Sequence, residues 1–190
     1  DIVVGTDSYR VHLFYDDGTE ADGFPFTTGN KEQSAPSILD VDGQKVIFAG
    51  CNDNTLYAIN ADGSLRFSIA TTNMVVNSPA FLKHNGVLYT FFSDKSGVVY
   101  AVDTDGNALS GWPVDVDQAI SQSVVFSDLD NDGEAEVIGL TELTDIIVYN
   151  LDGTTHEGFP MNDEFAFMSG PLVIDMDGDG DVEILGGSVN

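Results

Sequence analysis

The chain has 190 residues, of which 32 are Asp or Glu and only 6 are Lys or Arg, so its formal net charge is −26. Phosphate backbones and anionic membrane surfaces repel such a chain, which excludes nucleic-acid binding as a function class. Hydrophobic residues make up 42% of the sequence, enough to fill a folded core, and this excludes a disordered polyanion. No stretch approaches the roughly 18–20 consecutive apolar residues of a membrane-spanning helix, so we expect no membrane insertion.

Short apolar runs bounded by turn residues follow one another along the whole chain, and none has the spacing of a helix. Such runs predict β-strands. In chain order they are 2–5, 12–15, 35–40, 45–50, 56–60, 65–70, 78–83, 87–92, 98–102, 123–128, 136–140, 146–150, 171–175 and 183–187.

The runs belong to a repeat of about 45 residues. Four Asp-Gly pairs end at Gly18, Gly63, Gly106 and Gly153, at separations of 45, 43 and 47 residues. Gly-aromatic-Pro follows three of them, at 23–25, 111–113 and 158–160, whereas the second unit has 65–67 (Leu-Arg-Phe) there. We expect each Asp-Gly pair to form a tight hairpin with positive φ at both central residues.

Each unit contains four predicted strands, here named A to D, and a four-stranded unit with this period is typical of a β-propeller blade. The predicted fold class is therefore all-β, a β-propeller of four-stranded antiparallel blades. A β-sandwich is the alternative, although it does not predict a four-strand period. The approximate repeats are 1–45, 46–86, 87–136 and 137–183, and 184–190 begins a further strand.

The order of predicted strands is BCD, then ABCD three times, then AB. About four blades are thus present, and we expect them to form part of a larger ring of six to eight blades. The alternative is a closed four-bladed ring in which 171–175 completes the first blade, although 183–190 (EILGGSVN) would then have no place. The first residue is Asp1 rather than Met, so we expect a start other than natural initiation. The missing strands would come from the rest of a parent chain or from a second copy, because open sheet edges recruit partners.

Two acidic loops 47 residues apart, 128–136 (DLDNDGEAE) and 175–183 (DMDGDGDVE), share one pattern. Asp occupies positions 1, 3 and 5, Gly position 6 and Glu position 9. Oxygen-only ligands in a flexible loop suit calcium. The candidate metal ligands are Asp128, Asp130, Asp132, Glu134, Glu136, Asp175, Asp177, Asp179, Asp181 and Glu183, with Glu134 and Asp181 offering backbone carbonyls.

An EF-hand does not fit these loops. Its position 12 requires Glu, where this chain has Gly139 and Gly186, and strand-like runs flank both loops where helices would be needed. Two ordinary acidic surface turns remain the alternative. At the corresponding junctions of other units, 39–46 (LDVDGQKV) is shorter and 81–87 (FLKHNGV) has Lys83 in place of the first acid, so we expect ordinary turns there.

These loops and the segments DGNALSGWPV and DGTTHEGFPM resemble the FG-GAP or VCBS-type repeat propellers, which include the integrin α-subunit propeller and many bacterial surface proteins. The resemblance implies about two calcium ions, held between the first two strands of a blade. It also implies an extracellular or cell-surface location, in agreement with the millimolar calcium found there.

The sequence favours a non-catalytic module that binds a protein or carbohydrate on its loop face or acts as a spacer. No catalytic residue is predicted, because His12, His84 and His156 lie in no known motif. The alternative is part of a propeller enzyme, because 56–67 (LYAINADGSLRF) resembles quinoprotein repeats and polysaccharide lyases also use propellers. We expect Trp112 to pack between blades, with sugar stacking as its alternative, and Cys51 to be buried.

Overall fold

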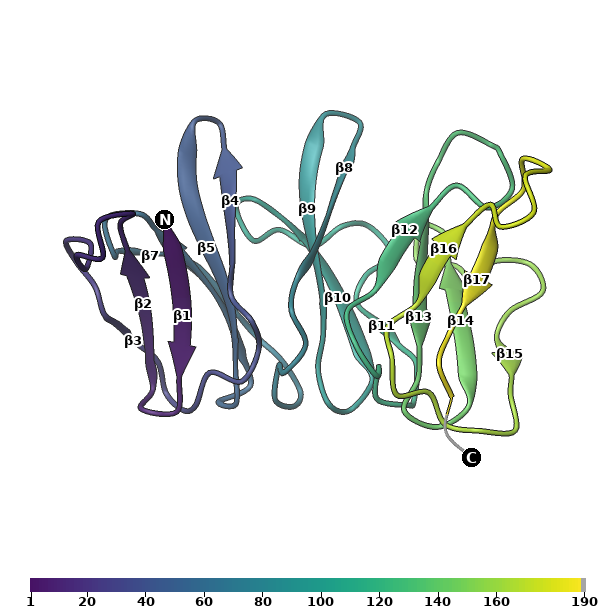
Figure 1. The fold of residues 1–190 in the computed structure, drawn as a ribbon, viewed down its shortest axis with the longest axis horizontal. Coiled ribbons are helices and arrows are strands. Elements are labelled where there is room, and N and C mark those ends of the chain that lie inside the picture. Colours follow the sequence, from purple (N-terminus) through teal and green to yellow (C-terminus); the bar gives the residue numbers. More distant parts are fainter. Residues whose placement is uncertain (189–190) are drawn as a thin grey trace.

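The computed structural model describes residues 1–188, which form seventeen β-strands in five antiparallel sheets (Figure 1). The first sheet consists of β1 (Ile2–Thr6), β2 (Arg10–Phe14) and β3 (Phe26–Thr27), and the second of β4 (Ser37–Val41), β5 (Gln44–Cys51), β6 (Thr55–Asn60) and β7 (Leu65–Ala70). The third contains β8 (Ala80–His84), β9 (Val87–Ser93), β10 (Val98–Asp103) and β11 (Val114–Asp115). The fourth contains β12 (Val125–Ser127), β13 (Glu136–Leu140), β14 (Asp145–Tyr149) and β15 (Met161–Asn162), and the fifth β16 (Leu172–Ile174) and β17 (Glu183–Leu185).

Strands neighbouring in sequence are neighbours in every sheet, so the strand order BCD, ABCD three times and AB is confirmed. The first sheet therefore lacks strand A, and the fifth contains only A and B within the described residues. Strand D has six residues in the second sheet but two in the first, third and fourth. In those three sheets D begins just after the proline of Gly-aromatic-Pro, which has no N–H to donate to a ladder.

The core lies between sheets, because the central strands are buried on both faces. In β5, Val46 and Phe48 pack toward the third sheet, whereas Ile47 and Ala49 pack toward the first. This is the two-residue alternation of a strand, with apolar side chains on both sides. A further buried cluster joins the third and fourth sheets and includes Trp112, which is 6% exposed. Its Nε1–H donates to the Leu151 carbonyl at 2.9 Å, and the predicted packing of Trp112 between blades is confirmed.

The Asp-Gly pairs between strands C and D form a different turn from the one predicted. Only the glycines have positive φ (82° at Gly18, 79° at Gly63), whereas the preceding aspartates do not. Gly18 N–H donates to the Tyr15 carbonyl, and Tyr15 N–H to the Thr19 carbonyl. This pattern is a three-residue hairpin loop with one left-handed glycine. Expecting positive φ at both residues was wrong here, because the aspartate carboxylate bonds the N–H two residues onward and leaves only glycine left-handed.

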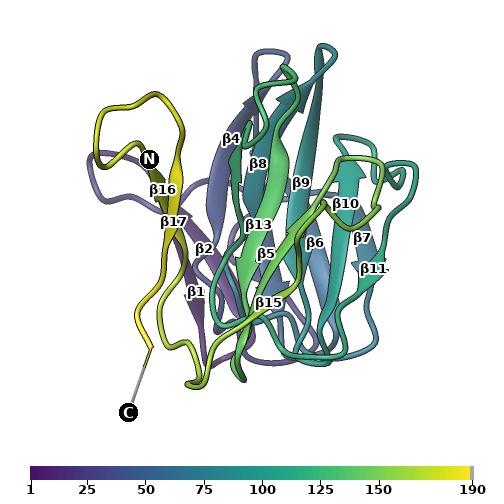
Figure 2. The same cartoon turned by 90° about the vertical axis from the view of Figure 1, so that its right-hand side faces the viewer.

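Positive φ at both turn residues occurs instead between strands A and B. Asp42 and Gly43 (φ 52° and 82°) connect β4 to β5, and Asn85 and Gly86 (φ 49° and 82°) connect β8 to β9. These are two-residue type I′ turns. In the fourth and fifth sheets the same connection is an acidic loop. All four A–B connections lie along the same edge of the molecule, at the top of Figures 1 and 2.

The two repeated glycine motifs interlock across sheets, a contact that the sequence did not indicate. A Cβ on Gly111, in Gly-Trp-Pro of the third sheet, would collide with the carbonyl of Asp152, and one on Gly153 with the carbonyl of Gly111. Gly23 and Gly63 make the same reciprocal approach between the first and second sheets. The Gly-aromatic-Pro of one sheet therefore meets the Asp-Gly turn of the next backbone to backbone, and only glycine fits at either position.

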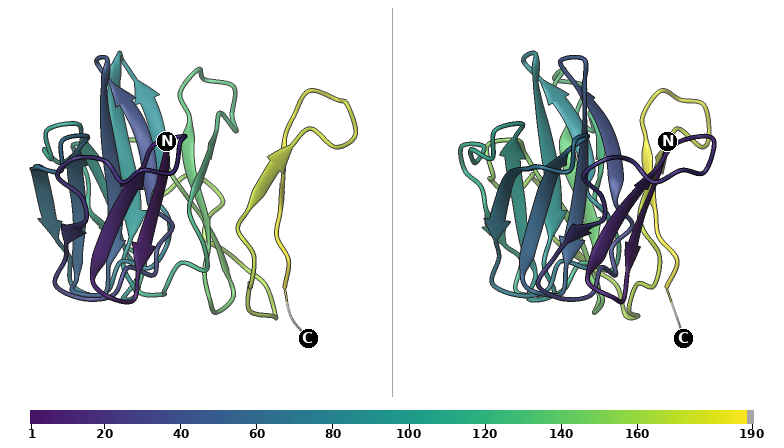
Figure 3. Two further views of the ribbon diagram at one scale, coloured as in Figure 1. Left: turned by 60° about the vertical axis from the view of Figure 1, so that its left-hand side comes forward. Right: turned by 90° about the vertical axis from the view of Figure 1, so that its left-hand side faces the viewer.

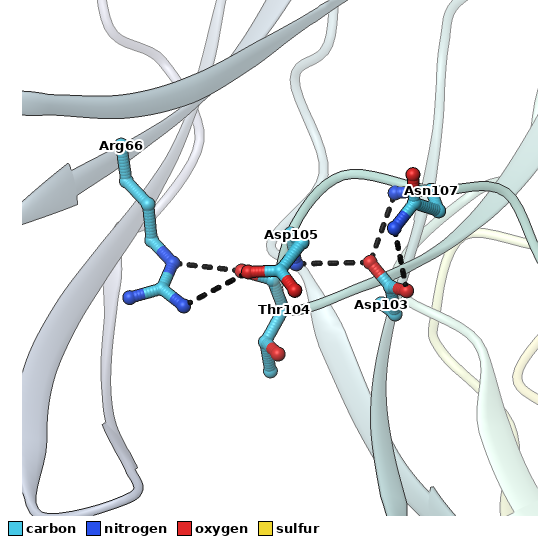
Figure 4. Close-up of polar contacts among 5 residues, drawn as sticks. All are labelled: Arg66, Asp103, Thr104, Asp105 and Asn107. Atoms are coloured by element: carbon cyan, nitrogen blue, oxygen red, sulfur yellow. Dashed lines mark hydrogen bonds and ion pairs between the residues drawn. The ribbon is translucent and has the colours of Figure 1, made fainter.

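The second and third sheets are joined at this point by side chains, as Figure 4 shows. The Arg66 Nε–H donates to the Thr104 carbonyl at 2.7 Å, and its Nη2 lies 3.3 Å from Asp105 Oδ1. Arg66 belongs to the Leu-Arg-Phe that replaces the glycine motif in the second unit, and Phe67 packs against Gly106. The charged Arg66 side chain thus connects the second and third sheets, where no glycine motif brings the two backbones together.

The fifth sheet is more exposed than the central sheets. The left panel of Figure 3 shows β16 and β17 set to one side of the other sheets. Leu172 and Ile174 of β16 are 57% and 46% exposed, in contrast to the buried strands of the central sheets. Residues 1–188 include no helix that could cross a membrane.

Candidate metal centre

The first acidic loop connects β12 to β13, and its own backbone fixes the positions of its carboxylates. Asp128 accepts hydrogen bonds from the N–H groups of Asp132 (3.1 Å) and Gly133 (3.0 Å). Glu136, the first residue of β13, accepts from the Leu129 N–H at 2.7 Å. The two ends of the loop are therefore tied together, and the carboxylates of positions 1 and 9 face the same point.

The second loop, between β16 and β17, repeats this arrangement. Asp175 accepts from the Gly180 N–H at 3.1 Å and from the Gly178 N–H at 2.6 Å. Glu183 accepts from the Met176 N–H at 2.8 Å, as Glu136 does from the residue at position 2 of the first loop. Two copies of the sequence thus fold to the same local geometry.

In each loop three carboxylates converge. Asp128, Asp130 and Glu136 each offer an oxygen within 4.8 Å of the others, and Asp175, Asp177 and Glu183 do the same. Oxygens on opposite sides of a hard cation such as calcium are about 5 Å apart, since each bond is roughly 2.3–2.6 Å. The donor sets therefore fit a hard metal ion. These are the groups of three or more such ligands found among residues 1–188.

The remaining predicted ligands lie around these triads. Asp132 and Asp179, at position 5, use one carboxylate oxygen to accept the N–H of position 7, at 2.8 and 2.9 Å. The Glu134 side chain points to a neighbouring sheet, where its Oε2 lies 3.8 Å from His84 Nδ1. The structure thus brings together positions 1, 3 and 9. The assignments of Asp132, Glu134, Asp179 and Asp181 as ligands stay predictions.

Burial distinguishes the two sites. Glu136 is 3% exposed, and this burial, together with the negative charges of Asp130 and Asp132, raises the pKa of its carboxyl above the ordinary value. The Leu129 N–H and the nearby His156 act in the opposite direction and lower this pKa. Glu183, by contrast, is only half-buried. A cation at the first site would offset the unfavourable burial of a carboxylate among other carboxylates.

The two loops also border apolar space. Leu129 of the first loop and Val182 of the second line a cavity of about 390 Å³ together with Ile146, Phe159 and Met161. This cavity lies between the fourth and fifth sheets, beside the candidate metal sites. Lys83 and His84, the last two residues of β8, lie across a smaller cavity of about 240 Å³ from Gly133 and Glu134.

Sequence reasoning missed both histidines near the first site. His84 and His156 come from different sheets. His84 lies 52 residues before Glu136 and His156 lies 20 residues after it, so only the folded structure brings them to the loop. The repeat gives a partial signal for His84, because its place at the end of strand A in the third unit puts it beside the A–B loop of the fourth.

No known protein-family profile and no curated protein matches the sequence. Solved structures match the fold. The C-terminal domain of Pseudomonas aeruginosa PilY1 superimposes with a TM-score of 0.73 at 15% identity, over 100% of this chain and 52% of that one. BamB from Moraxella catarrhalis gives 0.63 at 16% identity (91% and 49%), and BBS1N, crystallised in complex with ARL6DN, gives 0.64 at 17% identity (98% and 57%).

These likenesses show the fold alone, because all the identities are low. The chain has the β-propeller fold of antiparallel blades, as the 45-residue period predicted, and the β-sandwich alternative is wrong. It spans about half the length of the propeller structures it matches.

Proposed function

We propose that this chain is a non-catalytic, calcium-binding β-propeller module of an extracellular or cell-surface protein, of the FG-GAP or VCBS type. The observation that supports it is the duplicated convergence of three carboxylates in loops of identical spacing. A chance acidic turn has no reason to repeat the same hydrogen bonds 47 residues later.

Calcium is the ion that suits these loops best. Their ligands are carboxylate oxygens on a flexible connection, with a carbonyl at position 7 within reach, and calcium accepts about 6–8 such oxygens in irregular geometry. Magnesium demands near-octahedral geometry and loses its water reluctantly, so it should bind more weakly. Sites of this kind are filled where calcium is millimolar, which supports a location outside the cell.

The loop-bearing edge is the proposed recognition surface for a protein or carbohydrate ligand. Each occupied site would fix the conformation of eight connecting residues at that edge and reduce the local negative charge. BBS1N, a propeller-like relative in fold, was crystallised with a protein partner, which supports protein binding as one role of such a module. The edges of β1 and β17 would pair with strands from a parent chain or from a second copy.

Calorimetry on chelator-treated protein tests the metal assignment. We expect about two calcium sites in the wild type, one in Asp130→Ala, one in Asp177→Ala and none in the double variant. Asp16→Ala, which removes an exposed acid outside both loops, is the matched control and should retain both sites. Zero sites in the wild type, or a site that survives the double substitution, would contradict the assignment.

A further inference from the structure

Glu32 is a buried carboxylate far from the acidic loops. It lies in the connection between β3 and β4 and is 5% exposed. Both of its carboxylate oxygens are buried, and neither has a hydrogen-bond partner among residues 1–188. Among acidic groups this is unusual, because a buried ionised carboxylate without donors is strongly unfavourable.

The repeat shows that this position belongs to an apolar residue. In each of the first three connections between sheets, one carbonyl accepts a hydrogen bond from a turn N–H of the sheet that follows. That carbonyl belongs to Lys31, Met74 or Ala119. The next residue in each connection is therefore an equivalent position, and these residues are Glu32, Val75 and Ile120. Val75 is fully buried and Ile120 is 3% exposed, and each belongs to the core between two sheets.

The packing beneath these residues is also equivalent. A Cβ on Gly5, near the end of β1, would lie 2.6 Å from Glu32 Cβ, just as one on Gly50, near the end of β5, would lie 2.5 Å from Val75 Cγ1. Glu32 therefore occupies, at the junction of the first and second sheets, the place that valine fills at the next junction.

The donors that surround Glu32 are committed elsewhere. The Thr28 hydroxyl and the Cys51 thiol both donate to the Asn30 carbonyl, at 2.9 and 3.4 Å. The ammonium group of Lys31 pairs with Asp7 at 3.5 Å in an exposed contact.

The turn packed against this connection contributes further acceptors. Asn52 Oδ1 and Asp53 Oδ1 are buried without a partner, while Asp53 Oδ2 accepts from the Gly29 N–H at 2.8 Å and the Tyr57 hydroxyl at 2.7 Å. Burial raises the pKa of the Cys51 thiol to about 12 and also raises that of Tyr57, so both are neutral and Asp53 is the nearby charge.

A metal ion does not explain this group. The two acidic loops bring three ligand atoms within 4.8 Å of one another, whereas Glu32, Cys51 and Asp53 do not form such a set within residues 1–188. A proton does explain it, because a neutral carboxylic acid is small enough to pack where valine packs and supplies one O–H donor to a site rich in acceptors.

We propose that Glu32 is a proton-dependent switch at the junction of the first and second sheets: its neutral form packs as a core residue, and its ionisation loosens the junction. Burial raises the pKa of Glu32 from 4.5 to about 7; the nearby Cys51 thiol and Thr28 hydroxyl oppose this shift, and the charge of Asp53 adds a smaller contribution to it. The folded state therefore holds a proton that the unfolded state releases between about pH 4.5 and 7. Stability from this group is full at low pH and is lost as pH rises through about 7.

Matched variants test the switch. Unfolding of the wild type, Glu32→Val, Glu32→Gln and Val75→Glu is measured by urea titration at pH 5 and pH 8, at saturating and constant free calcium. Relative to Glu32→Val, we expect the wild-type unfolding constant to increase on the order of a hundredfold from pH 5 to pH 8. Glu32→Gln should show no such pH dependence, and Val75→Glu should acquire a second one at the next junction.

Hydrogen exchange locates the effect. At pH 8, corrected for the intrinsic rate, amides of β2 and β5 in the wild type should lose protection relative to Glu32→Val, while those of β13 and β14 should not. A wild-type to Glu32→Val ratio that is constant between pH 5 and pH 8 would overturn the proposal, and it can be measured even if Val75→Glu does not fold. Selective stabilisation of the wild type by sodium or calcium, absent in Glu32→Val, would also overturn it in favour of a bound cation.

Discussion

The fourth and fifth sheets contain the same sequence motifs in two different settings. Both begin with an acidic loop between strands A and B, and both follow a Gly-aromatic-Pro motif contributed by the preceding sheet. Around the fourth sheet these motifs are packed: Gly111 touches the next turn, and Glu136 is buried. Around the fifth, a Cβ on Gly158 would meet no atom of residues 1–188 within 4 Å, and Glu183 is half-buried.

The comparison separates the local conformation that a motif's own sequence determines from the stability that contacts with the adjacent sheet contribute. In both loops the N–H of position 2 donates to the Glu of position 9 and the N–H of position 6 donates to the Asp of position 1. The glycines of the two Gly-aromatic-Pro motifs also have nearly equal φ, 88° at Gly111 and 89° at Gly158. The energetic importance of each residue, however, depends on the contacts with the adjacent sheet. Substitutions made in pairs, one in each setting, measure that contribution directly.

The largest difference is expected for Gly111→Ala against Gly158→Ala. Both substitutions force a non-glycine residue to positive φ, which costs about 1–2 kcal/mol. Gly111→Ala also drives a methyl group into the Asp152 carbonyl, and overpacking of this kind adds about 1–3 kcal/mol. Urea unfolding followed by tryptophan fluorescence measures both, since Trp112 adjoins the packed site. Equal destabilisation by the two substitutions would show that the interlock is not formed.

A second, smaller difference is expected for Glu136→Gln against Glu183→Gln. Each should reduce calcium affinity at its own site by about tenfold, or roughly 1.4 kcal/mol, because one ligand charge is lost. Without calcium, Glu136→Gln should raise the midpoint of thermal unfolding, since it removes a carboxylate buried among like charges. Glu183→Gln should change that midpoint little. Differential scanning calorimetry with chelator and with calcium separates these effects, and a lowered midpoint of Glu136→Gln in chelator would contradict the charge argument.

The smallest effect is expected at position 4 of the loops, where Asn131 has φ 59° and Gly178 has φ 83°. Asn tolerates this left-handed conformation better than other non-glycine residues. Exchanging them, as Asn131→Gly and Gly178→Asn, should change stability and calcium affinity by only a few tenths of a kcal/mol. Asn131→Val, a β-branched control that disfavours positive φ, should weaken calcium binding clearly at the first site alone. If it does not, the conformation of position 4 is not what holds the ligands.

Much of the fold followed from the sequence because its signals are local. Continuous apolar runs in β5 and β6, and an Asp-Gly pair after each strand C, act within ten residues of one another. The acidic triads were equally accessible, since one loop supplies all their ligands. The predicted type of turn was wrong. Whether an Asp-Gly pair forms a two-residue or a three-residue hairpin loop depends on which N–H the Asp carboxylate accepts, and the spacing of the residues does not show which N–H this is.

Contacts between sheets were beyond sequence reasoning. Gly111 and Gly153 lie 42 residues apart and contact each other through their backbones, so no pattern of side chains in the sequence predicts the contact. Glu32 lies in a polar stretch, Asn30 to Gln33, that resembles an exposed connection. Its burial becomes visible only when the connection is aligned with those of Val75 and Ile120, and the hydrogen bonds that define this alignment are properties of the folded chain.

The connections between strands A and B have a consequence for how such a chain can change. Two residues complete the hairpin in the second and third sheets, and eight residues complete it in the fourth and fifth, from the same strand pair at the same edge. Lengthening a surface loop adds little closure entropy, because that entropy grows only with the logarithm of loop length. This edge therefore accepts insertions without disturbing the sheets beneath it. An acidic loop transplanted into the turn at 42–43 or 85–86 should carry its metal site with it, so that sites can be gained or lost one blade at a time.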